Sequence, residues 1–192
     1  MNNHMEIPWH EYTNKDSKVK IENASLTEKS SIIGRIGLML LACGTGAWRV
    51  RSSMNTIASE LNITCIADIG LTNISYTCID GIESHAQSLS LHNTSVNTSK
   101  LARMEDFVYH FKDECKTCTC NEIHNQLDQI ESIHSSYSPI ILGLAAALAC
   151  SCFTFLLGGG PIEMLCAFVG AGLGNALRMK LIKHNYTLFL NV

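Results

Sequence analysis

Hydrophobic and polar positions follow two different periods in the first two thirds of the chain. Apolar side chains first recur every three or four residues, as on one face of a helix, and from Ile63 they occur in short β-branched runs typical of strands. Asp80-Gly81, between two of these runs, is a strong β-hairpin signal. The predicted elements are helices over residues 26–42, 47–61, 98–111 and about 120–134, and strands over residues 63–69, 71–79 and about 85–91.

Two of these helices begin with a predicted capping box, in which an N-cap hydroxyl and a Glu three residues later satisfy free backbone amides. The two boxes are Ser25 with Glu28, and Thr119 with Glu122. Asn62 stands where a residue in the left-handed conformation would end the second helix. The sequence therefore predicts an α+β region of amphipathic helices and a small antiparallel β-meander.

The last third of the chain contains two long apolar runs. Residues 140–157 carry no charge, and residues 162–177 carry only Glu163. At about 1.5 Å per residue the first run gives roughly 27 Å of helix, close to the roughly 30 Å thickness of a bilayer's hydrocarbon core. An α-helical transmembrane hairpin is therefore predicted, with helices over about 140–157 and 162–177.

The distribution of charge predicts how this hairpin is oriented. Arg178, Lys180 and Lys183 follow the second apolar run, whereas the turn between the runs has no Lys or Arg. The positive-inside rule places such a cluster in the cytoplasm, and because a hairpin returns to its starting side, the N-terminal region is predicted there too. The predicted parts are a polar tail (1–24), a cytoplasmic α+β domain (25–137), two transmembrane helices (138–183) and an end that would begin a third membrane helix (184–192).

Composition excludes several classes of function. The formal net charge of −3 provides no basic patch for nucleic acid. No secretory signal is visible, so the nine cysteines are expected to stay as thiols in a reducing cytosol. The sequence has no nucleophile elbow, no phosphate-binding glycine loop and no zinc-protease motif. We therefore expect no enzyme activity and no cofactor.

Cys115, Cys118 and Cys120 form a C-x-x-C-x-C cluster, with His110 and His124 nearby in sequence. Thiolates and imidazoles at such spacing can complete a zinc site, and exposed thiols can sense oxidants. The second C-x-x-C pair of a zinc site is missing, and cysteines occur throughout the chain. Incidental free thiols are therefore the favoured interpretation, with metal binding as a weak alternative.

Small residues line both apolar runs and predict close helix packing, because they let helix backbones approach one another in lipid. Such packing can close the hairpin on itself. The second run has small residues on more than one face, which also predicts contact with the helices of a second membrane subunit or of another copy of the chain. The candidate packing residues are Gly143, Ala147, Gly158, Gly159, Gly170 and Gly174.

Several segments resemble the N-terminal half of the threonine/serine exporter family. Gly34 and the run Gly46-Ala47-Trp48-Arg49-Val50 resemble the opening signature of that family. The order of later features also agrees, from the β-meander through Lys100-Leu101 to Phe153-Thr154-Phe155-Leu156-Leu157-Gly158-Gly159. The resemblance extends from about Ser30 to the C-terminus.

The resemblance implies an exporter of small metabolites in the cell inner membrane, built as one long chain or as two subunits. Its solutes would be amino acids such as threonine and serine, or small dicarboxylates. Arg51 departs from the family, which usually has an acid there, and the chain looks like a truncated or split subunit. The alternatives are a membrane-anchored cytoplasmic regulatory or sensor module and an inactive remnant.

Four residues are candidates for transport or substrate binding. Glu163 is an ionisable group near the start of the second apolar run and could handle protons or cations, or simply favour a helix N-terminus. Asn175 and Arg178, near its other end, could meet a carboxylate, although Arg178 could also be an interfacial anchor. Arg49, at the Arg-Val position of the family, either binds an anion or pairs with an acid of the fold.

Overall fold

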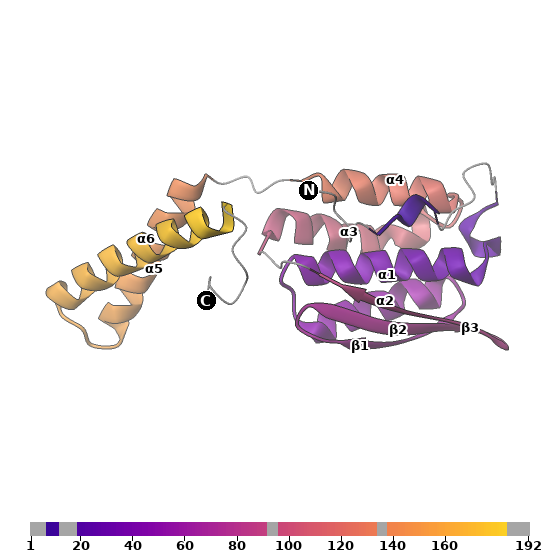
Figure 1. The fold of residues 1–192 in the computed structure, drawn as a ribbon, viewed down its shortest axis with the longest axis horizontal. Coiled ribbons are helices and arrows are strands. Elements are labelled where there is room, and N and C mark those ends of the chain that lie inside the picture. The colour runs from indigo at the N-terminus through magenta and orange to yellow at the C-terminus, as the bar shows by residue number, and fades with distance from the viewer. Residues whose placement is uncertain (1–6, 12–18, 92–95, 134–137, 184–192) are drawn as a thin grey trace. The chain divides into compact units, whose positions relative to one another are not determined.

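The computed structural model describes residues 7–11, 19–91, 96–133 and 138–183, without the side chains of residues 139 and 179–183. The chain divides into two compact units, named here unit 1 (Met1–His134) and unit 2 (Ser135–Val192) (Figure 1). Each unit is described by itself. The segment 184–192, predicted to begin a third membrane helix, lies outside the described residues.

Unit 1 contains the predicted helices and strands in the predicted order. Both capping boxes are present, Asn62 has a left-handed φ of 56°, and Gly81 forms the hairpin turn with a φ of 59°. The prediction of an α+β region with a small antiparallel meander is therefore confirmed. The elements are the 3-10 turns η1 (Trp9–Glu11) and η2 (Ile21–Asn23), the helices α1 (Leu26–Ala42), α2 (Ala47–Glu60), α3 (Thr98–Glu114) and α4 (Cys120–Glu131), and the strands β1 (Thr64–Ile69), β2 (Asn73–Asp80) and β3 (Glu83–Ser90).

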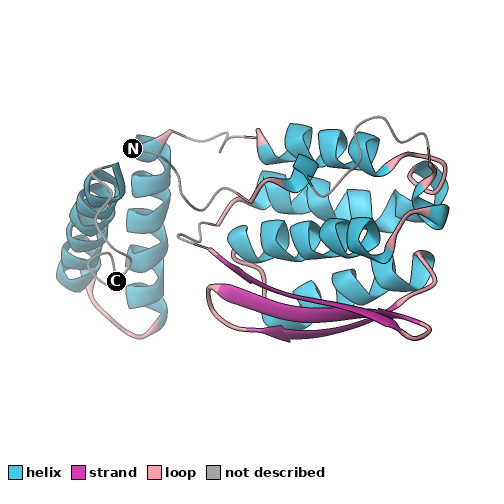
Figure 2. Ribbon diagram, turned by 45° about the vertical axis from the view of Figure 1, so that its right-hand side comes forward, coloured by secondary structure: helices cyan, strands magenta, loops and turns pink. Residues whose placement is uncertain are grey.

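The three strands form one antiparallel sheet in the order β1-β2-β3, and helices cover one of its faces (Figure 2). Residues alternate between the two faces, as strand geometry requires. On β2 the buried positions are Ile74, Tyr76 and Cys78, and their neighbours on the strand are more exposed. The sheet therefore supplies one wall of the core, and the described residues of unit 1 leave its other face uncovered.

Helix α1 is the centre of unit 1, because it packs against α2, α3 and α4 and against strands β2 and β3. Residues 29–41 of this helix are all buried, and from Ile32 onward its sequence is apolar apart from Arg35, which is typical of a fully enclosed helix. Two glycines allow its neighbours to approach closely. A Cβ on Gly34 would overlap the Tyr76 ring, and one on Gly37 would lie 2.6 Å from Met54 Sδ.

Unit 2 is a pair of packed helices, α5 (Pro139–Leu156) and α6 (Pro161–Lys183). Ser138 caps α5 by accepting a hydrogen bond from the Ile141 amide, and proline stands at the start of each helix, where it costs no hydrogen bond. Gly158 has a φ of 88° and turns the chain between the helices. At the interface Ala147 is buried, and a Cβ on Gly172 would contact it at 3.6 Å.

The prediction that these helices form a transmembrane hairpin is wrong. Among the residues that the structure describes, no helix is both long enough and apolar enough to cross a membrane. Helix α5 has 18 residues, about 27 Å at 1.5 Å per residue, which is less than the hydrocarbon thickness. Helix α6 has 23 residues, but Glu163, Asn175 and Arg178 interrupt its apolar surface.

Candidate functional site

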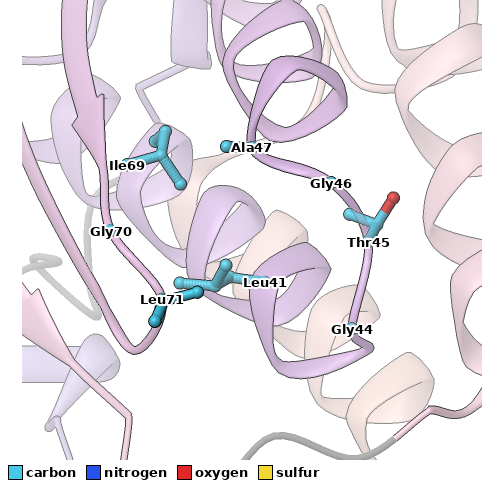
Figure 3. A pocket seen from close by; sticks show the side chains of 8 residues that line it. All are labelled: Leu41, Gly44, Thr45, Gly46, Ala47, Ile69, Gly70 and Leu71. Carbon is cyan, nitrogen blue, oxygen red and sulfur yellow. The ribbon is translucent and has the colours of Figure 1, made fainter.

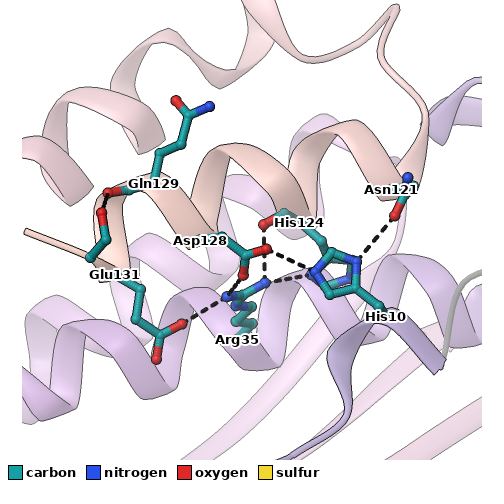
Figure 4. A network of polar contacts seen from close by, with 8 residues as sticks. His10, Arg35, Asn121, His124, Asp128, Gln129 and Glu131 are labelled. Carbon is teal, nitrogen blue, oxygen red and sulfur yellow. Dashed lines mark hydrogen bonds and ion pairs between the residues drawn. The ribbon is translucent and has the colours of Figure 1, made fainter.

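A buried arginine lies in the middle of α1 and holds α4 (Figure 4). Arg35 is only 2% exposed. Its guanidinium donates to the His124 carbonyl oxygen at 3.1 Å, to Glu131 Oε2 at 2.7 Å, and to Asp128 Oδ1. The three acceptors share one face of α4 at a spacing of four and three residues. Arg35 therefore ties α1 to α4 through charge-assisted hydrogen bonds.

His124 is fully buried beside this arginine. Its Nδ1 lies 3.3 Å from Arg35 Nη1, which can only donate, so Nδ1 accepts. Its Nε2 lies 3.1 Å from Ser31 Oγ, whose own proton goes to the Glu28 carbonyl, so Nε2 carries the hydrogen. These contacts fit a neutral imidazole. Burial and then the charge of Arg35 lower the pKa of His124 to about 3.

The 3-10 turn η1, near the start of the chain, packs against the same cluster through His10 (Figure 4). His10 Nε2 lies 2.8 Å from Asp128 Oδ2, and His10 Nδ1 lies 3.1 Å from Asn121 Oδ1. The Trp9 ring stacks on His124, with centroids 6.3 Å apart. Three segments that are far apart in sequence, namely η1, α1 and α4, therefore meet at this polar cluster.

The carboxylates of the cluster already occupy the guanidinium of Arg35, so its charge is not free to bind a solute. Burial opposes the ionisation of Asp128, but hydrogen bonds from Arg35 and His10 outweigh it and lower the pKa of Asp128 below its usual value. The cluster therefore serves the fold. The sequence analysis did not find it, although a charged residue inside the apolar segment 32–41 signals a buried ion that needs partners.

Arg49 lies in the first turn of α2 and forms an ion pair with Glu105 of α3 at 2.9 Å. Both side chains are about half exposed. Arg51 donates from Nε to the Ala67 carbonyl oxygen of β1 at 3.0 Å. The two arginines therefore connect α2 to different neighbours, and Arg49 already has an acidic partner.

A cavity of about 410 Å³ lies where the loop between α1 and α2 faces the turn between β1 and β2 (Figure 3). Leu41 and Ile69 supply apolar walls, and the loop Gly44-Thr45-Gly46 contributes mainly backbone. Gly46 caps α2 without a side-chain hydrogen bond. Thr45 is the only lining residue with a polar side chain, so the cavity is suited to apolar groups. Its lining consists of Leu41, Gly44, Thr45, Gly46, Ala47, Ile69, Gly70 and Leu71.

A second cavity, of about 420 Å³, lies between α3 and α4 and has the opposite character. Its lining combines one arginine, two acidic and two amide side chains with three apolar ones. Arg103 and Asp106 lie 3.9 Å apart as a weak surface pair. Groups of both charges in one cleft can contact both ends of a zwitterion. The lining residues are Arg103, Asp106, Phe107, Glu114, Gln126, Gln129, Ile130 and Ile133.

The candidate transport residues of unit 2 lie apart along α6. Glu163 is exposed in the first turn, beside the glycines that precede the helix. Arg178 is exposed four turns later. Asn175 points toward Gly143 of α5, and its buried Nδ2 has no hydrogen-bond partner among the described residues. The structure therefore does not bring these side chains together into one site.

The predicted packing glycines have three different surroundings. A Cβ on Gly143 would lie 3.5 Å from Asn175 Nδ2, so this glycine faces α6. Gly158 and Gly159 form the turn between the helices. Cβ atoms on Gly170 and Gly174 would have no described atom within 4 Å. These last two glycines therefore lie on the open surface of α6.

The three thiols of the C-x-x-C-x-C cluster point to different partners. Cys115 Sγ donates to Gln126 Oε1 at 3.5 Å, Cys118 Sγ to the Glu114 carbonyl, and Cys120 Sγ to the Glu28 carbonyl. Burial raises the pKa of Cys115 and of Cys120 to about 12, so both are protonated. Among the described residues, no three His, Cys, Asp or Glu side chains are placed to hold a metal ion.

Comparison with protein families finds one match that covers most of the chain. The family model described as "Putative threonine/serine exporter" matches residues 31–192. No curated protein and no solved structure matches. The matched region begins inside α1, at residue 31, and includes every later helix and strand.

Proposed function

The chain belongs to the threonine/serine exporter family, and from this membership we propose that it is a component of a transporter that exports small hydrophilic metabolites. The family is one of transporters and not of enzymes, so it implies a location at a membrane. The observation that carries the proposal is the match over residues 31–192. We further propose that the membrane is the cell inner membrane and that the solutes are amino acids such as threonine and serine.

The surface of unit 2 supports a role in assembly. Large apolar side chains are exposed along both α5 and α6, far more than a soluble surface requires. A groove of about 480 Å³ between the helices has an almost wholly apolar lining. We propose that apolar helices of a second subunit, or of another copy, cover this surface. The exposed residues include Ile140, Leu144, Leu148, Phe153, Phe155, Ile162, Leu165, Val169 and Leu173.

A crosslinking experiment tests this assembly. Cys166 is an exposed thiol on α6, near the outward-facing Gly170. In native membranes, a bifunctional thiol reagent is expected to join Cys166 to another polypeptide, giving a band larger than the chain. The Cys166→Ser variant shows how much crosslinking comes from the other thiols. Recovery of the monomer alone, at full labelling of Cys166, would contradict the proposed assembly.

Glu163 is the candidate for coupling export to protons or cations. It is the only acidic residue described in α6 and is exposed at the first turn. If its carboxylate exchanges protons during export, Glu163→Gln removes the pH dependence of threonine efflux. The measurement is efflux rate against pH for both proteins. Glu22→Gln, an exposed acid in η2, is the control. An unchanged pH profile in Glu163→Gln would exclude Glu163 from coupling.

The α3–α4 cleft supports a second candidate function, that of a regulatory module that senses a solute. Unit 1 has its own core, and this cleft presents Arg103 and Asp106 in one place. A small zwitterion would find a partner there for each of its charges. Efflux distinguishes the two functions, because a sensor binds threonine without increasing the amount that leaves the cell.

A further inference from the structure

Three large apolar side chains surround the loop between α1 and α2. Trp48 is 72% exposed, Leu71 is 92% exposed and Val96 is 79% exposed. A Cβ on Gly44 would lie 3.3 Å from Val96, and one on Gly46 would lie 3.9 Å from Trp48. Leu71 lines the cavity beside the same loop (Figure 3). These residues therefore belong to one surface, named here the loop face.

The loop face is continuous with the apolar cavity at its centre. Leu41 and Ile69 form the walls of that cavity, and the intervening loop exposes glycine backbone. Single exposed apolar residues are normal, but three around an apolar hollow of about 410 Å³ mark a contact surface. No described residue covers the exposed parts of these side chains.

Two basic side chains, Arg51 and Lys100, lie near the loop face. The first turn of α2 contains no acid, although acids are favoured at that end of a helix. Arg49 is neutralised by Glu105, whereas the acceptor that the described residues provide for Arg51 is a backbone carbonyl. Burial raises the pKa of the Cys43 thiol, and the charge of Lys100, in the first turn of α3, partly opposes this rise. Arg51 and Lys100 therefore leave positive charge beside an apolar surface.

We propose that the loop face lies against a bilayer that contains anionic phospholipid. Tryptophan favours the boundary between lipid headgroups and hydrocarbon, because its ring is apolar and its N–H can donate to polar groups. Leu71 and Val96 would enter the same boundary, and Arg51 and Lys100 would attract acidic headgroups. The inference rests on the proposed function only in placing the chain at a membrane.

Quenching of Trp48 fluorescence by lipid tests the inference directly. The chain has two tryptophans, so Trp9→Phe in the full chain leaves Trp48 as the only one. This protein is mixed with vesicles of phosphatidylcholine and phosphatidylglycerol that carry a nitroxide near the headgroup. We expect a blue shift of the emission and strong quenching, with less of both in vesicles of phosphatidylcholine alone. In the chain that keeps Trp9, Trp48→Phe should remove most of the quenching by lipid.

Two exposed positions on opposite ends of the sheet provide a matched pair of variants. Leu71→Asp, at the β1–β2 turn, is introduced into the Trp9→Phe chain. It should abolish the quenching of Trp48, even where the protein still sediments with vesicles. Ile82→Asp, at the β2–β3 turn, replaces an equally exposed apolar residue and should leave the quenching unchanged. Both side chains are exposed, so neither substitution should disturb the core.

Several results would overturn the proposal. Trp48 could remain unquenched while the chain sediments with the vesicles, or Leu71→Asp could be quenched as strongly as its parent. Equal quenching in neutral and anionic vesicles would remove the role of the basic residues. A blue shift that depends on protein concentration, without quenching by lipid, would assign the loop face to a second copy of the chain. None of these measurements depends on solute export, so this proposal and the proposed function can fail separately.

Discussion

Replacing Asp128 and Glu131 together by alanine is expected to lower the free energy of unfolding of unit 1 by about 3 kcal/mol. The reason is the environment of Arg35, which is 2% exposed and would keep its charge after losing both carboxylates. A buried charge without a counterion is costly, whereas the half-exposed carboxylates are easily hydrated. Denaturant unfolding followed by tryptophan fluorescence measures this, because both tryptophans lie in unit 1.

The same argument predicts an asymmetry between the two sides of the network. Arg35→Met removes the buried charge and leaves the two acids in contact with water, so it should cost much less than the double substitution. Combining Arg35→Met with both alanine substitutions should restore most of the lost stability. Asp106→Ala, which removes exposed contacts to Arg103 and His110, is the control and should cost less than about 1 kcal/mol. Equal losses for Arg35→Met and the double variant would refute this account.

Acidification from pH 7 to pH 5 is expected to destabilise unit 1 by about 2 kcal/mol through His124. In the unfolded chain the pKa of His124 is near 6.5, and in the folded protein burial and Arg35 lower it to about 3. The unfolded state therefore binds more protons between these values. The stability that comes from neutral His124 is complete above pH 6.5 and is lost progressively as the pH falls.

His124→Asn should remove this dependence, because its amide oxygen can replace Nδ1 as an acceptor for Arg35 but does not titrate. Asp128, whose pKa is lowered below its usual value, stays ionised throughout this range and contributes little to the slope. His110→Asn is the control, since His110 is partly exposed on α3. Unfolding curves at several pH values measure the slope. The same slope in wild type and His124→Asn would show that His124 is not the group responsible.

Local signals in the sequence were sufficient to predict most elements of unit 1. The capping boxes at Ser25 and Thr119 mark helix starts because a side chain there satisfies backbone amides of its own helix. The hairpin at Gly81 is similarly local, since a φ of 59° suits glycine. The same reasoning predicted a transmembrane hairpin wrongly, because it weighed the absence of charge in α5 above its length and gave too little weight to Asn175 and Glu163 in α6.

The polar network of unit 1 depends on contacts that no local pattern contains. Arg35 and Asp128 are separated by more than 90 residues and meet only because α1 and α4 pack side by side. His10 reaches the same place from a short turn near the N-terminus. The cavity beside the loop face likewise combines Leu41 with Ile69 from a strand. A period of 3.6 or 2 residues identifies which face is buried, but not which face it meets.

Threonine efflux from intact cells tests the central claim most directly. Cells that contain the chain, cells from which it has been deleted and deleted cells in which it is restored are loaded with labelled threonine. We expect deletion to remove a saturable part of the efflux, and restoration to return it. An efflux rate that is the same in all three, with the restored chain detected in the membrane fraction, would contradict the assignment of this chain to an exporter of small hydrophilic metabolites.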